Sequence, residues 1–354
     1  MTQVDVIDEH EFQQLGRVKC VVWDLDHTVW DGILLEDDEV VARSEIVDAI
    51  RRLDSIGVLH SIASRNDHGA AMHRLEQLGL ADYFLAPQIS WNPKSQAVRE
   101  IAAALNIGID TLAFVDDQPF ELEEVRYHAP EVLTVPVERL AWAMAQPAFT
   151  PRFVTQDARQ RRGLYRANEG RTHAEREFEG TNEEFLATLG LRLAIAPART
   201  GDLERAEELT VRTNQLNSTG RTFDYAELDR LRQSPDHLLL VAGLEDRFGS
   251  YGTIGLALVD TSTSTWRLEL LLMSCRVVSR GVGTVVLNHV MRRARNAGAD
   301  LVADFVHTGR NRVMFVTYMF AGFTERSRAG DVSELHSTLE HIQDPPAYLV
   351  LELG

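Results

Sequence analysis

Two aspartates separated by one residue follow the first apolar stretch of the chain. The run Cys20-Val21-Val22-Trp23 predicts a short buried strand of the parallel type, and Asp24 and Asp26 come directly after it. Ligands bind at the carboxyl ends of such strands, and residues two apart in an extended segment point the same way. The two carboxylates can therefore share one cation and one phosphate group. On spacing alone, a solvated aspartate pair at a strand end is the competing interpretation.

Three more elements follow in an order that favours phosphate chemistry. They are an apolar strand at 59–64 that ends in the hydroxyl of Ser64, Lys94 at the mouth of a helix at 95–105, and a strand at 111–115 followed by Asp116 and Asp117. A phosphoryl group in transfer needs an in-line nucleophile, a proton donor for the leaving oxygen, and positive charge against its other oxygens. Each of these roles has a candidate residue here.

Over residues 18 to about 135 the chain resembles the haloacid dehalogenase superfamily of aspartate phosphatases. The resemblance implies that Asp24 is the nucleophile that becomes an aspartyl-phosphate and that Asp26 is the general acid and base. It also implies that phosphate is bound by Ser64, Arg65 and Lys94, and that Mg²⁺ is held by Asp24, the backbone carbonyl of Asp26, and Asp116 or Asp117. Gaps of only about thirty residues separate the first three elements, enough for crossover helices but not for a large cap.

Composition bounds the rest of the chain. Its 354 residues, 44% hydrophobic and 25% charged, predict an ordinary globular protein with two domains. The formal charge of −17 argues against nonspecific nucleic-acid binding. The polar start, Met1 to Phe12, and the lack of a long apolar run predict neither a signal peptide nor a membrane span. Two cysteines form no disulfide framework, so we expect a cytoplasmic, reducing compartment.

The predicted fold class is α/β in two parts. We expect a Rossmann-like parallel-sheet domain at 1–150, a charged helical connector at 151–183, and a second α/β domain at 184–354. Within the second domain, a strand at 266–273 leads to Ser274-Cys275-Arg276, and Gly281 and Gly283 then open a helix that runs to Asn296. A strand, a glycine loop and a helix form an anion-binding geometry, although a tight turn before a helix explains the glycines equally well.

This order of elements resembles the acyl-CoA-dependent N-acetyltransferase fold, in which the glycine loop cradles a pantetheine diphosphate. Val278 stands where that family usually carries Arg or Gln. A capless aspartate phosphatase followed by an acetyltransferase-like domain resembles the FkbH-like glyceryl transferase family from Lys19 to Phe323. The motifs that carry this second resemblance are Thr213-Asn214-Gln215, Asp246-Arg247-Phe248-Gly249 and Met273-Ser274-Cys275-Arg276.

The family resemblance implies an activity. Members take the glyceryl unit of 1,3-bisphosphoglycerate, remove phosphate, and load the unit as a thioester onto the phosphopantetheine arm of an acyl carrier protein for polyketide assembly. The substrate carries one phosphate ester and one acyl phosphate, which call for different chemistry. Asp24 would handle the phosphoryl group, and Cys275 would accept the acyl group, because a thiolate attacks a mixed anhydride readily.

Several residues of the second domain are candidates with a structural alternative. Cys275 is either the acyl acceptor or a buried filler, whereas Cys20, at the start of the first strand, is expected in the core. His289 is the candidate base for Cys275, with His307 as a weaker one. The residues expected to bind substrate or pantetheine, some of which also suit turns and caps, are Asn214, Gln215, Arg276, Arg280, Gly281, Gly283 and Asn311.

Alternatives to glyceryl transfer remain open at this stage. The basic run Met291-Arg292-Arg293-Ala294-Arg295 could dock an acidic carrier protein or be a solvated helix face. The chain could also be a magnesium-dependent small-molecule phosphatase whose second domain is a lid, in which case Cys275 is dispensable. A third alternative is a coenzyme A-dependent N-acyltransferase, which Val278 and the intact phosphatase motifs disfavour.

Overall fold

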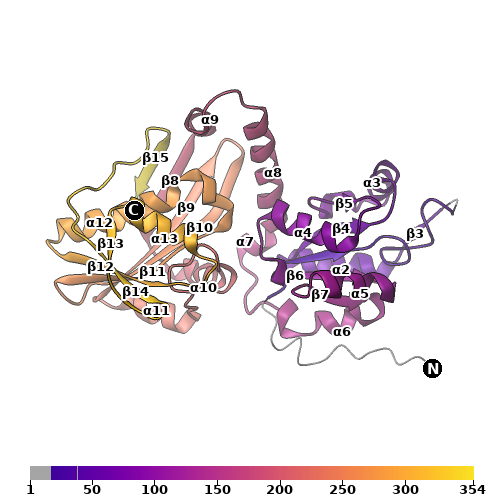
Figure 1. The fold of residues 1–354 in the computed structure, drawn as a ribbon, viewed down its shortest axis with the longest axis horizontal. Coiled ribbons are helices and arrows are strands. Elements are labelled where there is room, and N and C mark those ends of the chain that lie inside the picture. The colour runs from indigo at the N-terminus through magenta and orange to yellow at the C-terminus, as the bar shows by residue number, and fades with distance from the viewer. Residues whose placement is uncertain (1–16, 38) are drawn as a thin grey trace. The chain divides into compact units, whose positions relative to one another are not determined.

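The structure is a computed structural model that describes residues 17–37 and 39–354. The chain divides into two compact units, one ending at Arg166 and the other running from Ala167 to Gly354. The division falls within the predicted connector, which is helical and comprises α7 (Gln156–Arg159), α8 (Arg161–Glu177) and the start of α9 (Asn182–Leu189) (Figure 1). The expected absence of a signal peptide at Met1 to Phe12 lies outside the described residues.

The first unit is built on a parallel sheet. Its five strands lie in the order β5-β4-β1-β6-β7, and every neighbouring pair is parallel. The strands are β1 (Cys20–Trp23), β4 (Leu59–Ser64), β5 (Gln88–Ile89), β6 (Leu112–Asp116) and β7 (Leu133–Pro136). All residues of β1, β4 and β6 are buried. The predicted Rossmann-like parallel sheet is confirmed.

Alternation along β1 divides the core of this unit into two halves. Cys20 and Val22 pack on the side of α4 (Lys94–Leu105) and α5 (Pro119–His128). Val21 and Trp23 pack on the opposite side, which is covered by α2 (Ser44–Ser55), α3 (His68–Gln77) and α6 (Leu140–Met144). Both faces of the sheet are therefore covered, as a parallel sheet requires. Cys20 lies in the core as expected, and burial raises the pKa of its thiol.

Short insertions connect the strands that carry the predicted site. Between β1 and β4 the described residues form a two-stranded antiparallel sheet, β2 (Trp30–Asp31) and β3 (Val41–Ala42), followed by α2. Between β4 and α4 lie α3, the 3₁₀ turn η1 (Ala81–Tyr83) and β5. Neither insertion forms a domain of its own, so the expected absence of a large cap is confirmed for this part of the chain.

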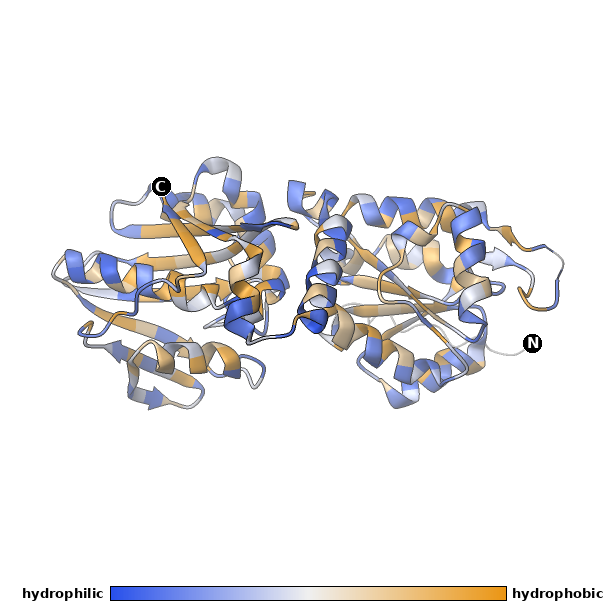
Figure 2. Ribbon diagram, turned by 90° about the horizontal axis from the view of Figure 1, so that it is seen from above, coloured by the Kyte–Doolittle hydropathy of each residue, from blue (hydrophilic) through white to orange (hydrophobic). Residues whose placement is uncertain are grey.

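The second unit is built on an eight-stranded mixed sheet with the order β13-β14-β12-β11-β10-β9-β8-β15. The strands are β8 (Leu191–Pro197), β9 (His237–Asp246), β10 (Gly249–Asp260), β11 (Thr265–Met273), β12 (Asp300–Val306), β13 (Phe323–Ala329), β14 (Val332–Ser337) and β15 (Leu349–Leu353). The pairs β11–β12 and β8–β15 are parallel, and the others are antiparallel. Figure 2 shows hydrophobic residues along the strands and many hydrophilic residues on the helices.

Helices cover both faces of this second sheet. On one face α10 (Leu203–Arg212) and α11 (Tyr225–Gln233) contribute to a core with β10 and β11. On the other face α9, α12 (Val282–Asn296) and α13 (Arg312–Phe320) pack against the sheet. None of the helices in the described ranges combines the length and hydrophobicity that crossing a membrane requires.

A buried arginine ties α8 to the β9–β10 hairpin and explains one of the family motifs. Arg171 is fully buried and donates to both carboxylate oxygens of Asp246, over 2.8 and 2.9 Å. The Tyr251 hydroxyl and the Phe248 backbone N–H also donate to Asp246. Burial alone would raise the pKa of Asp246, but these hydrogen bonds outweigh it and hold the pKa below its usual range. The Asp246-Arg247-Phe248-Gly249 motif therefore has a structural role.

A buried histidine on β4 makes the stability of the first unit depend on pH. His60 is fully buried, and the Trp23 indole donates to its Nδ1 over 3.0 Å. That hydrogen bond requires Nδ1 to be unprotonated, so the imidazole is neutral. Burial lowers the pKa of His60 from its ordinary 6.5 to about 3.

Acid should destabilise the protein through His60. Below pH 6.5 the unfolded chain takes up a proton at His60 and the folded chain does not, so the free energy of unfolding falls by up to about 1.4 kcal/mol per pH unit. We expect this fall to be less steep in His60→Gln between pH 6.5 and 4.5, in urea unfolding followed by tryptophan fluorescence. His73→Gln, at an exposed position, is the control and should keep the wild-type slope. Equal slopes for His60→Gln and wild type would contradict the prediction.

Candidate active site

The carboxyl ends of three adjacent parallel strands bring the predicted phosphate-site residues together. Asp24 follows β1, Ser64 ends β4 and Asp116 ends β6, and β1 pairs with both of the other strands. Lys94 is the first residue of α4, which packs on the same face of the sheet as Cys20 and Val22. The predicted edge of the sheet therefore carries all four motifs.

Lys94 joins the two strand-end carboxylates. Its Nζ lies 2.8 Å from Oδ1 of Asp24 and 2.6 Å from Oδ2 of Asp116, and the three residues are 3%, 4% and 0% exposed. Burial alone would lower the pKa of Lys94, but the two carboxylates outweigh it and the pKa lies above its usual value. Lys94 is therefore charged at neutral pH.

The charges of this cluster do not balance without a further cation. Asp24, Asp116 and Asp117 place carboxylate oxygens within 4.8 Å of one another, and Lys94 supplies a single positive charge beside them. Burial raises the pKa of Asp24 to about 6, an effect that Lys94 opposes and Asp116 reinforces. The pKa values of Asp116 and Asp117 are raised as well, mainly by burial. Three clustered carboxylate ligands form the donor set that a hard divalent cation such as Mg²⁺ prefers.

Local hydrogen bonds orient the two carboxylates that follow β6. The Gln118 backbone N–H donates to Oδ1 of Asp116 over 2.8 Å, which leaves Oδ2 for Lys94. Thr28 is buried beside Asp117, where its hydroxyl donates to Oδ1 and accepts from the Asp117 backbone N–H. The loop after β1 therefore positions a residue of the loop after β6.

Asp26 is held by three donors and lies apart from the metal-capable group. The Trp30 indole and the Leu34 backbone N–H donate to its Oδ1 over 2.7 and 3.1 Å, and Asn66 donates to its Oδ2 over 3.0 Å. Only its backbone carbonyl was predicted as a metal ligand, and these donors orient its carboxylate. Sequence reasoning missed Asn66, although it follows the strand-end Ser64 by two residues and the even spacing was a usable signal.

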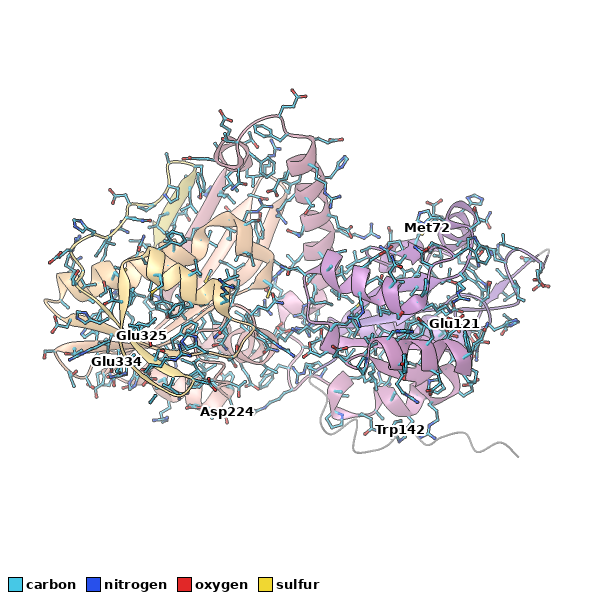
Figure 3. The ribbon with its side chains drawn as sticks, in the orientation of Figure 1. Met72, Glu121, Trp142, Asp224, Glu325 and Glu334 are labelled. Carbon is cyan, nitrogen blue, oxygen red and sulfur yellow. The ribbon has the colours of Figure 1, made fainter. Side chains whose placement is uncertain are left out.

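The phosphate-binding candidates Ser64 and Arg65 occupy different environments. Ser64 is buried, and a hydrogen bond from its hydroxyl to the Asp24 carboxylate opposes the rise in the pKa of Asp24 that burial causes. Arg65 is partly exposed and pairs with Glu121 over 3.2 Å, a residue labelled in Figure 3. Ser64 therefore acts directly on the candidate nucleophile, and Arg65 is engaged by α5 at the rim.

In the second unit the structure places Cys275 at the first position of a 3₁₀ helix, η6 (Cys275–Arg280). The expected glycine loop after β11 is thus mostly helical, because η6 lies between the end of β11 at Met273 and Gly281. The Cys275 thiol lies 3.9 Å from Oε1 of Gln215 and donates to it. Of the predicted pair Asn214 and Gln215, Gln215 is brought to the sulfur, and Asn214 is exposed.

The basic and glycine candidates around η6 are largely used by the fold. Arg280 is 3% exposed and pairs with Glu175 of α8 over 3.2 Å. Arg276 donates from Nε to the Ser274 hydroxyl over 3.3 Å. Gly281 lies between η6 and α12 with φ = 71°, and a Cβ there would approach the Tyr348 hydroxyl to 2.9 Å. At Gly283 an added Cβ would lie 3.5 Å from Cγ of Met273, an ordinary contact distance.

Neither candidate histidine is placed as a base for Cys275 by the contacts of the structure. Burial, together with Arg293 and Arg292, lowers the pKa of His289 on α12. His307 exchanges a hydrogen bond with the Ser333 hydroxyl on β14, at 3.0 Å. Arg292, in the predicted docking run, pairs with Asp344 over 3.0 Å. The amide of Gln215 is a group that the structure places beside the sulfur.

The Asn311 side chain hydrogen-bonds the protein's own backbone. Its side chain is 2% exposed, and its amide donates to the backbone carbonyls of Asn217 and Val306 over 3.0 and 2.8 Å. Its Oδ1 accepts from the Thr308 backbone N–H. Both ends of the amide are therefore engaged within the protein, and Asn311 occupies the N-cap position of α13 without a side-chain hydrogen bond to that helix.

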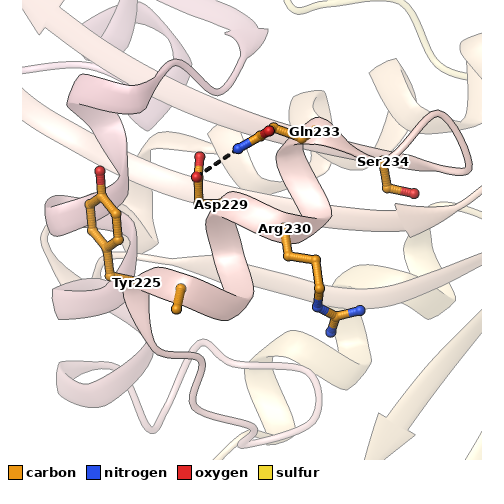
Figure 4. A pocket seen from close by; sticks show the side chains of 6 residues that line it. Tyr225, Asp229, Arg230, Gln233 and Ser234 are labelled. Carbon is orange, nitrogen blue, oxygen red and sulfur yellow. Dashed lines mark hydrogen bonds between the residues drawn. The ribbon is translucent and has the colours of Figure 1, made fainter.

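An open pocket on the second unit lies along α11 and does not include any predicted site residue (Figure 4). Within it Gln233 donates to Asp229 over 2.7 Å. Its lining residues are Tyr225, Ala226, Asp229, Arg230, Gln233 and Ser234.

No protein-family model and no curated protein matches the sequence. Among solved structures, 38% of the chain is similar to the N-terminal part of a Bacteroides fragilis protein, which contains a phosphatase domain and is complexed with Mg; the identity is 26% and the TM-score 0.35. The chain spans 41% of the length of that structure.

Other similar structures are of a different kind. The chain is similar over 41% of its length to the PaiA N-acetyltransferase of Thermoplasma acidophilum in complex with coenzyme A, with 17% identity, 98% of that chain covered and a TM-score of 0.33. It is similar over 41% to a domain from Methanocaldococcus jannaschii, with 13% identity, 99% of that chain covered and a TM-score of 0.35. At these TM-scores the chemistry of the chain is inferred from the geometry of its own residues.

Lys94 should be replaceable by neither an apolar residue nor arginine. Lys94 and Lys19 are the only lysines among 36 basic residues. Lys94→Met leaves two buried carboxylates without their cation, and we expect the free energy of unfolding to fall by about 3–5 kcal/mol in urea titrations without metal. Lys94→Arg should also destabilise, because a planar guanidinium cannot replace a point charge between two oxygens.

Lys19, which is only partly buried, provides the matched control. We expect Lys19→Met and Lys19→Arg to change the free energy of unfolding by about 0.5 kcal/mol or less. A Lys94→Arg variant as stable as wild type would show that charge alone, without the compact shape of the ammonium, satisfies the site.

Proposed function

We propose that the chain is an enzyme that transfers the glyceryl unit of 1,3-bisphosphoglycerate, with loss of phosphate, to the phosphopantetheine thiol of an acyl carrier protein. Such a glyceryl thioester would serve polyketide biosynthesis. The observation that carries the proposal is the buried Lys94 ammonium between Asp24 and Asp116, at the strand edge where Ser64 contacts Asp24. The pairing of this site with Cys275 in a second α/β unit supports the acyl-transfer half.

The first unit would remove the phosphate ester. The Asp24 carboxylate attacks the phosphorus, the bond from phosphorus to the glyceryl oxygen breaks, and Asp26 gives that oxygen a proton. Water then attacks the aspartyl-phosphate, Asp26 takes a proton from the water, and phosphate leaves. The hydrogen bonds from Trp30, Leu34 and Asn66 fix the direction in which the Asp26 carboxylate points.

Mg²⁺ fits the same edge of the sheet. Asp24, Asp116 and Asp117 would hold it, since their oxygens cluster and their charges exceed that of Lys94. When bound, the ion stabilises negative charge on the phosphoryl oxygens. The solved phosphatase-domain structure that is complexed with Mg supports this proposal for the cofactor.

The second unit would carry the acyl group. The thiolate of Cys275 attacks the carboxyl carbon of the acyl phosphate, a carbon–sulfur bond forms, and phosphate leaves with the electron pair of the broken carbon–oxygen bond. The carrier thiolate then attacks the resulting thioester and releases Cys275. Removal of one phosphate as an ester and of the other as an acyl leaving group explains why two sites would serve one substrate.

The proposal is tested by intact-mass spectrometry of a phosphopantetheinylated carrier protein. The protein is incubated with the carrier, magnesium and enzymatically generated 1,3-bisphosphoglycerate. A glyceryl mass on the carrier supports the transferase. Phosphate release without carrier modification would instead indicate a phosphatase, and acetylation of an amine with acetyl-CoA would indicate an N-acyltransferase.

Phosphate release from the ester should require Asp24 and a divalent cation. We expect Asp24→Asn to lower the rate by about a thousandfold or more, because an amide cannot form the phosphoenzyme. Chelation of divalent ions should abolish release and added Mg²⁺ should restore it, as measured by a phosphate assay. Asp110→Asn, in a turn before β6, is the control. Full activity in Asp24→Asn would overturn the assignment of the nucleophile.

Carrier loading should require Cys275 while ester hydrolysis does not. We expect Cys275→Ala to leave the carrier unmodified and to keep phosphate release from the ester close to that of wild type. Both are read from one reaction, by intact mass and by phosphate assay. Cys20→Ala, at the buried cysteine of the first unit, controls for the loss of a thiol. Glyceryl loading by Cys275→Ala would rule out the thioester relay.

A further inference from the structure

Two parallel strands of the second unit pair over only part of their length. β11 and β12 are in register from Thr265–Asp300 to Leu268–Ala303, and no ladder pairs link the later residues of the two strands. The remaining half of β11 runs on to Met273, directly before Ser274 and Cys275. Its backbone groups on that side therefore need other partners.

A short segment from the loop after α10 supplies those partners. We call Leu216-Asn217-Ser218 the insert segment. It lies between the diverging halves of β11 and β12, and all three of its residues are buried. Met273 donates to Leu216 O over 2.8 Å, Ser218 donates to Leu271 O over 2.9 Å, and Val306 donates to Ser218 O over 2.9 Å. The Ser218 hydroxyl also accepts from the Leu271 backbone N–H.

A side-chain hydrogen bond from Asn311, just before α13, also fastens the insert segment. The Asn311 amide donates to the Asn217 carbonyl over 3.0 Å and to the Val306 carbonyl over 2.8 Å. The Asn217 side chain accepts from the backbone N–H groups of Thr219 and Gly220. The segment is thus bound to β11 on one side and to β12 on the other, which fixes the residue that precedes it.

Gln215 immediately precedes the insert segment, and its Oε1 lies 3.9 Å from the Cys275 sulfur. We infer that Gln215 is a positioning residue for Cys275, and that Asn311 acts on the thiol from a distance by holding the insert segment. Leu216 is anchored at Met273, two residues before Cys275, so the amide and the sulfur are fixed to the same end of β11.

The contact has a chemical consequence. The thiol donates its proton to the Gln215 carbonyl oxygen, and a hydrogen bond of that kind stabilises the protonated form of an acid. Gln215 therefore holds the sulfur in one orientation and keeps it a thiol until a base or substrate arrives. The role of this control in acyl transfer rests on the proposed function, but its effect on the thiol does not.

Alkylation of Cys275 by iodoacetamide measures the effect without substrate or carrier. Gln215→Met has a similar shape and no carbonyl. We expect its alkylation at pH 7 to be about twofold to fivefold faster, because losing one hydrogen bond changes the equilibrium between thiol and thiolate by a factor of about that size. In Gln215→Glu we expect it to be about tenfold slower, because a carboxylate disfavours the thiolate. The pH midpoint of the rate should move in opposite directions in the two variants.

Gln233→Met and Gln233→Glu are the matched controls, because Gln233 lies on α11 and is bonded to Asp229. Cys20 is fully buried and should stay unmodified in every variant, which peptide mass spectrometry verifies. Equal rates in wild type and Gln215→Met, or a change of the same sign in Met and Glu variants, would overturn the inference.

The inferred indirect effect of Asn311 on the Cys275 thiol is tested by substituting Asn311. Asn311→Leu removes both donated hydrogen bonds, and we expect it to speed alkylation of Cys275 about as much as Gln215→Met. Asn288→Leu is its control, because Asn288 is equally buried in the same unit and holds the Gln343 carbonyl instead. Circular dichroism and thermal unfolding check that the variants are folded.

A double variant separates positioning from general loosening. If Asn311 acts through Gln215, the Gln215→Met, Asn311→Leu double variant should alkylate no faster than the quicker single variant. Additive increases in the alkylation rate would show that Asn311 does not act through Gln215. If Asn311→Leu fails to fold, Ser218→Ala is used instead, because it removes another hydrogen bond that holds the insert segment. The alkylation rates do not depend on carrier loading, because neither substrate nor carrier is present. If the carrier is not loaded, the inference about Gln215 is unaffected, and if the alkylation tests fail, the proposed glyceryl transfer is unaffected.

Discussion

The Lys94 ammonium is the interaction on which the arrangement of the first unit depends. A parallel sheet brings the ends of β1 and β6 side by side, and both strands end in carboxylates that the fold removes from water. Buried like charges repel one another strongly, so Asp24 and Asp116 can share this edge only with a cation between them. The first residue of α4 supplies it, which fixes where that helix begins and what covers the adjacent core.

The second unit balances its buried charges with arginine. Arg171 meets Asp246 through two parallel hydrogen bonds, and Arg280 meets Glu175. A planar guanidinium suits one carboxylate approached edge-on, whereas a compact ammonium suits two carboxylates that converge on one point. The choice of cation in each unit follows from the number and direction of the oxygens that it meets.

The parts predictable from sequence are those in which local pattern and sheet topology coincide. Asp24, Ser64 and Asp116 lie at the ends of apolar strands, and parallel strands must place such residues at one edge, where Lys94 joins them from the start of α4. The strand at 266–273 was also predicted, and it corresponds to β11. Asn66 was not predicted: its even spacing from Ser64 places it at the same strand end, but only the fold decides that it meets Asp26, 40 residues away.

Other elements that the sequence did not predict also depend on contacts with distant parts of the chain. β13 exposes all but its first residue and so lacks the alternation that marks a half-buried strand, and β15 is a strand only because it pairs with the distant β8. The insert segment has no strand pattern of its own. Its hydrogen bonds exist because β11 and β12 diverge, which is a property of the assembled sheet and not of any short stretch of sequence.

The scarcity of lysine gives the first unit a built-in chemical reporter. Of the two lysines, Lys19 is partly accessible and Lys94 is closed off between two carboxylates. An amine-reactive reagent therefore marks Lys19 in the native protein and reaches Lys94 only when α4 separates from the strand edge. The ratio of the two modified peptides reports how often this edge opens, without any label being introduced.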